Sequence, residues 1–123
     1  MLRQGPLSPF VHGVAEYVGA VVFIAAPFLL GFDEDAPTAI SIVVGVALLV
    51  FTASSDLPTG LARTLPAPIH AVIDVILAIF LIAAPFLFNF RDEAAATAFF
   101  IVMGILQLLL TIGTRFLPAR AAV

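Results

Sequence analysis

Four continuous apolar runs, separated by short polar segments, make up most of the chain. They cover residues 10–32, 37 to about 54, 69–90 and 94 to about 113. Each run is close to the roughly 20 residues that an α-helix needs to cross the hydrocarbon core of a bilayer. A strand of a membrane β-barrel would alternate polar and apolar residues over about 10 positions, and these runs do not alternate. The pattern therefore predicts an all-α membrane protein with four transmembrane helices.

The polar segments between the runs predict how the helices connect. Residues 33–36 and 91–93 are short and acidic, which favours two tight antiparallel hairpins with negative charge beside the N-terminus of the following helix. Residues 55–66 form a longer connection between the hairpins. We expect a single transmembrane domain over residues 1–123, folded as an up-down-up-down four-helix bundle.

The first and third runs are copies of one another. Residues 24–29, Ile-Ala-Ala-Pro-Phe-Leu, recur identically as residues 82–87, at an offset of 58. With one further residue of offset, three positions of the second run recur in the fourth: Thr38, Gly45 and Thr52 match Thr97, Gly104 and Thr111. This repeat predicts two tandem helical hairpins at about 10–56 and 68–115. Because each unit crosses the membrane twice, the units have the same orientation and a pseudo-twofold axis along the membrane normal relates them.

Composition supports lipid as the solvent of these runs. The chain is 63% hydrophobic and 11% charged, whereas soluble domains contain about 25% charged residues. The absence of Cys from the sequence excludes disulfides, thiolate metal sites and cysteine nucleophiles. The sequence also has no Lys and no dense basic run, so we expect no nucleic-acid partner.

The arginines predict the orientation of the chain. Arg3, Arg63, Arg115 and Arg120 fall at the two ends and in the central connection, all on one side of the predicted bundle. Arg91 falls on the other side, in an acidic turn. By the positive-inside rule we expect a multi-pass protein of the cell (inner) membrane with both termini in the cytoplasm.

The duplicated hairpin resembles the SPW-repeat family of small bacterial and archaeal membrane proteins. That family has Ser-Pro-Trp late in the first helix of a two-helix unit, where this chain has Ala26-Pro27-Phe28 and Ala84-Pro85-Phe86. The resemblance covers about residues 10–56 and 68–115 and rests on the proline position, the hairpin length and the duplication. It implies an integral membrane location and assigns no catalytic residue.

Two pairs of ionisable residues lie inside the predicted spans. His12 and Glu16 are four residues apart, as are His70 and Asp74, so each pair shares one helix face. Carboxylates at such depth are costly and point into the bundle, where they are paired or hydrated. Three further polar residues are expected near the same level and complete a candidate cluster: Gln107, Thr52 and Thr111.

The chemistry of this cluster leaves three readings open. The histidines and carboxylates can pair within each helix and hydrogen-bond across helices, which fixes packing at about 0.6–2 kcal/mol per bond. The same four residues, His12, Glu16, His70 and Asp74, have the donors for zinc or another divalent metal. The two histidines are also able to ligate one haem iron from opposite faces. We expect no cofactor, and the ligand, if there is one, is not specified by the sequence.

Prolines inside the first and third runs predict helix kinks. Pro27 and Pro85 lack an N–H and clash with the preceding turn, which frees the carbonyls of Phe23 and Leu81. Such kinks serve packing in membrane helices, where prolines are tolerated. A freed carbonyl lining a cation site is the alternative reading.

Glycines on three runs predict close helix packing. Gly45 and Gly104 lie at the midpoints of the second and fourth runs, and Gly19 lies in an Ala15-x-x-x-Gly19 step on the first. A residue without a Cβ lets a neighbouring backbone approach closely in a membrane. We expect all three glycines to serve helix packing.

The short loops predict a non-enzymatic role. They leave almost no mass outside the membrane, so partners would be met through the helices. We therefore expect a scaffold or an accessory subunit, embedded in the lipid bilayer, in a homo-oligomer or a larger membrane complex. The alternative is a metal, haem or ion/proton site at the histidine–carboxylate cluster, serving transport or redox chemistry.

Overall fold

A computed structural model describes residues 6–114 and contains four helices. They are α1 (Pro9–Leu29), α2 (Asp35–Ala53), α3 (Ala67–Leu87) and α4 (Ala94–Ile112). All four are long and apolar enough to cross a membrane, and the described residues contain no strand beyond isolated bridges. The predicted all-α class with four spans is therefore confirmed.

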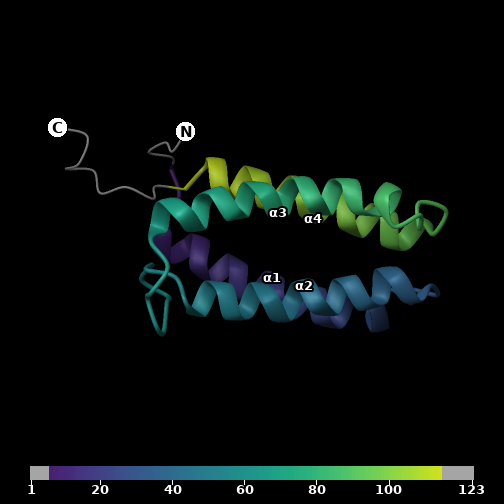
Figure 1. Cartoon of the computed structure of the whole chain (residues 1–123), viewed down its shortest axis with the longest axis horizontal. Helices are drawn as coiled ribbons and strands as arrows, with labels where there is room; N and C mark the ends of the chain where they lie inside the picture. The colour runs from purple at the N-terminus through teal and green to yellow at the C-terminus, as the bar shows by residue number, and fades with distance from the viewer. Residues whose placement is uncertain (1–5, 115–123) are drawn as a thin grey trace.

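The helices form two antiparallel hairpins that lie side by side (Figure 1). α1 packs mainly against α2, and α3 against α4. The start of α1, the end of α4 and the connection 54–66 lie at the same end of the bundle, where the Leu7 N–H donates to the Gly113 carbonyl at 2.8 Å. We call this the terminal end, and the end with the two hairpin turns the turn end.

Equivalent residues close the two hairpins in the same way. α1 and α3 end before the apolar runs do, because Gly31 and Asn89, 58 residues apart, adopt left-handed backbone with φ of 67° and 58°. The next N–H in each turn then returns to a proline carbonyl: Phe32 to Pro27 at 3.0 Å, and its equivalent in the second hairpin at 2.9 Å. The connections, residues 30–34 and 88–93, are therefore longer than the apolar runs suggest.

Close helix packing depends on Gly45 and Gly104. A Cβ at Gly45 would lie 2.7 Å from the Ala20 carbonyl oxygen, and one at Gly104 would lie 2.9 Å from the Ala78 carbonyl oxygen. Gly19 differs from the prediction, because a Cβ there would meet only the Leu48 side chain, at 3.9 Å. Gly19 opens space beside α1 instead of bringing a backbone close.

The freed carbonyl of α1 has a protein donor. Both α1 and α3 continue for two residues beyond their internal prolines, and the predicted kinks stay a prediction. The Ser41 hydroxyl on α2 donates to the Phe23 carbonyl at 2.6 Å, one turn before Pro27. Ser41 thus replaces the donor that Pro27 lacks, and the alternative of a cation site at a freed carbonyl stays a prediction.

The two ends of the hairpin interface differ in chemistry. Aromatic rings fill the half toward the turn end, with Phe23 against Phe99 and Phe90 against Phe100 at centroid distances of 5.2 and 5.1 Å. At the terminal end the connection folds over the bundle, where Tyr17 donates its hydroxyl to a connection carbonyl at 2.9 Å. His12, Glu16, His70 and Asp74 lie in this half of the bundle.

Candidate functional site

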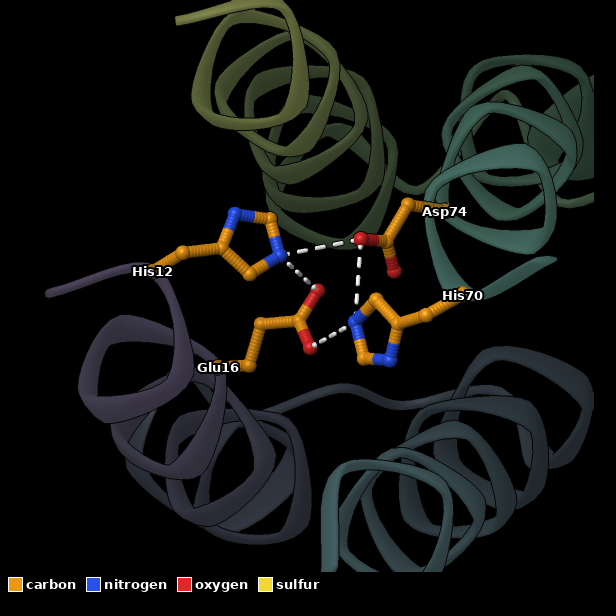
Figure 2. A group of neighbouring side chains, drawn as sticks. All are labelled: His12, Glu16, His70 and Asp74. Atoms are coloured by element: carbon orange, nitrogen blue, oxygen red, sulfur yellow. Dashed lines mark hydrogen bonds and ion pairs between the residues drawn. The ribbon is translucent and has the colours of Figure 1, made fainter. Parts of the chain in front are cut away.

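The structure brings His12, Glu16, His70 and Asp74 together at the centre of the bundle. His12 and Glu16 come from α1, and His70 and Asp74 come from α3, on the diagonally opposite helix (Figure 2). Each residue is no more than 1% exposed. The i, i+4 spacing on both helices aims an imidazole and a carboxylate at the same point.

Imidazole nitrogens and carboxylates alternate around this cluster (Figure 2). His12 Nε2 lies 3.0 Å from Glu16 Oε2 and 2.9 Å from Asp74 Oδ2. His70 Nε2 lies 2.8 Å from Glu16 Oε1 and 3.1 Å from Asp74 Oδ2. Each histidine therefore pairs both within its own helix and with the other hairpin.

Two hydroxyls hold the outer side of the imidazole rings. His12 Nδ1 lies 2.8 Å from Thr114 Oγ1, and His70 Nδ1 lies 2.5 Å from Ser55 Oγ. Each hydroxyl donates its own hydrogen to a backbone carbonyl four residues earlier, at 2.6 and 2.7 Å. A hydroxyl has one hydrogen, so each accepts its second bond from the imidazole, and the Nδ1 atoms carry the donated protons.

The protons on Nδ1 determine the state of the two Nε2 atoms, which point into the cluster. With Nδ1 protonated, the neutral imidazole presents a lone pair on Nε2, and both Nε2 atoms point at carboxylate oxygens. Two acceptors at 2.8–3.1 Å repel unless a proton or a cation lies between them. The four-residue cluster therefore needs positive charge at its centre, supplied by protons or by a metal ion.

The two carboxylates differ in how fully they are bonded. Glu16 accepts further hydrogen bonds from Thr52 at 3.0 Å and from Gln107 at 3.1 Å. Asp74 Oδ1 and Thr111 Oγ1 are buried, and neither has a hydrogen-bond partner among the described residues. Thr111 is the repeat equivalent of Thr52, so the shorter aspartate lacks the bond that the glutamate makes.

The comparison with protein families agrees with the duplicated hairpin. A family model described as the SPW repeat domain matches residues 10–114. The chain belongs to the SPW repeat family. Searches of curated proteins and of solved structures gave no match. The family and the four apolar helices together describe this SPW repeat protein as a small multi-pass membrane protein.

The donor set of the SPW repeat protein fits one ion better than a haem. Four donor atoms, one from each residue of the cluster, lie within 4.8 Å of one another. Zinc holds imidazole nitrogen and carboxylate oxygen at about 2.0–2.2 Å, so each donor would move inward by less than about 1 Å. A porphyrin needs the space between the two Nε2 atoms, and carboxylates bonded to both nitrogens fill that space.

Sequence reasoning missed three residues that the structure ties to the polar groups. Ser55 and Thr114 bind the imidazoles, and Ser41 satisfies the carbonyl before Pro27. The repeat carried a usable signal for two of them, because Ser55 and Thr114 are hydroxyl residues 59 positions apart, one turn after the matched threonines. Each reaches across to the histidine of the other hairpin, which no pattern within one unit indicates.

Proposed function

We propose that this SPW repeat protein binds one divalent transition-metal ion inside the membrane, between its two hairpins. The ligands are His12, Glu16, His70 and Asp74. The observation that supports this role is the convergence of both Nε2 atoms and both carboxylates, with each Nδ1 already committed to a hydroxyl. Metal-bound histidines characteristically donate their second N–H in this way, which orients the ring and sets its tautomer.

Zinc is the first candidate for the ion. Imidazole and carboxylate donors in equal number suit zinc and its neighbours in the first transition row, and the four-residue cluster includes no soft sulfur ligand. Two carboxylates balance the charge of a divalent ion, so the loaded site is neutral. Neutrality favours burial, because an uncompensated charge in an apolar interior is strongly destabilising.

Metal content of the purified protein tests this function. We expect one ion per chain by inductively coupled plasma mass spectrometry, and its loss in the His12→Ala/His70→Ala double variant. The control is Glu34→Gln/Asp92→Asn, which removes two exposed acids at the turn end and should leave the metal content unchanged. A native protein that is metal-free and fails to take up Zn²⁺ would contradict the proposal.

Proton release provides a second readout. Without a metal ion, the four contacts between the Nε2 atoms and the carboxylate oxygens require two protons, whether nitrogen or oxygen holds them. A divalent ion replaces both, so binding should release two protons per Zn²⁺ in weakly buffered detergent solution. Release of no protons would place the bound ion elsewhere, for example on the exposed acids.

The orientation of the protein belongs to the same proposal. Arg63 lies in the connection at the terminal end, and Arg91 lies in a turn at the other end. Arg3, Arg115 and Arg120 lie outside the described residues and flank the first and last helices in sequence. We therefore assign the terminal end to the cytoplasm of a cell membrane. A C-terminal green fluorescent protein fusion should fluoresce, and an active C-terminal alkaline phosphatase fusion would contradict this orientation.

The scaffold or accessory-subunit role expected from the short loops stays a prediction. Lipid accounts for the apolar outer faces of the helices without a protein partner. The polar cluster is the more specific feature. Burying four ionisable side chains in a membrane bundle costs free energy, and packing the helices in lipid does not require such residues.

A further inference from the structure

Two grooves run along the seams where the hairpins meet. The α1/α4 seam holds a cavity of about 320 Å³, and the α2/α3 seam holds two, of about 240 and 260 Å³. The repeat relates the two seams, since most residues that line the α1/α4 cavity have equivalents that line the α2/α3 cavities. Differences between the seams therefore show where the duplicated hairpins have diverged.

At two positions α1 presents smaller residues to the α1/α4 seam than α3 presents to the α2/α3 seam. Ala15 and Gly19 line it, at the positions that Ile73 and Leu77 occupy in the α2/α3 seam. At Gly19 an added Cβ would meet only one side-chain atom, Leu48 Cδ2, at 3.9 Å. The groove therefore has room for a Cβ at Gly19.

Phe51 in the α2/α3 seam has no aromatic equivalent in the α1/α4 seam. Phe51 stacks on the His70 ring at a centroid distance of 4.1 Å and an angle of 14°. The equivalent position on α4 is Leu110, which lines the α1/α4 groove. Phe51 thus closes the α2/α3 seam beside the polar cluster, whereas a smaller aliphatic side chain stands in the α1/α4 seam.

The α1/α4 groove also reaches polar residues. Gln107 and Glu16 line it, while Leu48 stands at the repeat equivalent of Gln107 and the residues that line the α2/α3 seam are apolar. Toward the outside, Val18 and Leu106 are more than half exposed, so the groove opens on the surface that faces lipid. A path therefore leads from the bilayer to the edge of the central cluster.

The chemistry of the groove defines what it accepts. Both carboxylate oxygens of Glu16 are already bonded within the bundle, so the Gln107 amide is the polar group that an incoming molecule meets. An amide recognises an uncharged hydroxyl or carbonyl, and no basic residue lines the groove to balance a charged head group. The volume lies at the low end of small-molecule pockets, about 300–1,000 Å³, which suits a slender molecule.

We propose that the α1/α4 seam is a binding site for a single-chain, uncharged amphiphile that enters from the bilayer and places its hydroxyl or carbonyl on Gln107. The apolar body lies along α1 beside Gly19, in the space that Leu77 fills in the other seam. This site borders one metal ligand, Glu16, and it does not depend on a metal ion.

Photo-labelling in phosphatidylcholine nanodiscs tests the site directly. The probe is a 1-hexadecanol analogue with a diazirine in its chain, and labelled residues are mapped by mass spectrometry. Labelling should saturate, concentrate on residues of the α1/α4 seam, and fall at least tenfold with excess 1-hexadecanol but not with hexadecane. Gly19→Leu/Leu110→Phe copies the second seam into the first and should reduce labelling by a similar factor.

Matched variants separate the site from general lipid contact. Ala47→Leu fills the α2/α3 seam instead and should leave labelling unchanged, and Gln107→Leu should remove the advantage of hexadecanol over hexadecane. Gly19→Ala, which the structure accommodates, should reduce labelling by an intermediate factor if the double variant does not fold.

Several outcomes would overturn the proposal. Equal labelling of both seams, or equal competition by hexadecane, would mean that any lipid chain fills the groove. Cross-links between two copies of the chain through the seam would mean that a second protomer occupies it. Gly19→Leu/Leu110→Phe retains all four metal ligands, so its zinc content reports separately on the metal proposal.

Discussion

The two hairpins share their packing and differ in their polar chemistry. Gly45 and Gly104 bring the helices together against equivalent carbonyls, at nearly equal distances. At the cluster, however, Glu16 accepts bonds from four side chains, whereas Asp74 uses a single oxygen, shared by the two histidines. Both copies retain the close backbone packing. Glu16 is one methylene longer than Asp74, and the two carboxylates meet different polar atoms.

The two seams between the hairpins also differ, because polar residues line only the α1/α4 cavity. Gly19, Gln107 and Leu110 line one seam, and Leu77, Leu48 and Phe51 stand at the equivalent positions of the other. The hairpin pair is therefore symmetric in its backbone and asymmetric in its access to the centre. Variants that exchange equivalent residues test this comparison.

The largest expected effect is on the two carboxylates. Removing one partner from a buried ion pair costs about 3–5 kcal/mol, because the remaining charge is left uncompensated. Glu16→Gln should destabilise by about this amount, and Asp74→Asn by less, since Asp74 makes fewer bonds. Reversible unfolding in mixed detergent–SDS micelles measures both. Equal losses would show that the extra bonds of Glu16 contribute nothing.

A smaller and symmetric effect is expected at the packing glycines. Gly45→Ala and Gly104→Ala place a Cβ within 3 Å of a helix carbonyl, so each should cost about 1–3 kcal/mol through overpacking. Gly19→Ala is the control and should change the free energy of unfolding little. Destabilisation of only one of these two variants in the same unfolding assay would contradict equivalent packing in the two hairpins.

The smallest expected change in the free energy of unfolding is at the two threonines of the cluster. Thr52→Val removes a bond to Glu16 and should cost about 1 kcal/mol, near the upper part of the range for membrane hydrogen bonds. Thr111→Val removes a hydroxyl with no partner among the described residues and should be neutral or slightly stabilising. A loss at Thr111 as large as at Thr52 would reveal a bound water or ion beside Asp74.

The sequence alone determined the number of spans, their pairing into hairpins and the family. The spans follow from uninterrupted apolar stretches of bilayer length, and the repeat follows from an identical six-residue segment. Both are properties of the chain order and do not depend on which residues meet in the folded protein. The i, i+4 spacing also placed His12 with Glu16 and His70 with Asp74 on common faces. The spacing within one helix could not show that the two faces meet.

Only the tertiary structure decided how the pairs combine and what surrounds them. His12 meets Asp74 and Thr114 from the other hairpin, and Ser41 reaches the carbonyl before Pro27. Such contacts depend on helix rotation and on side-chain reach to within an ångström, which periodicity does not encode. For the same reason Gly19, expected to bring helices together, instead opens a seam, because no backbone of the folded bundle passes beside it.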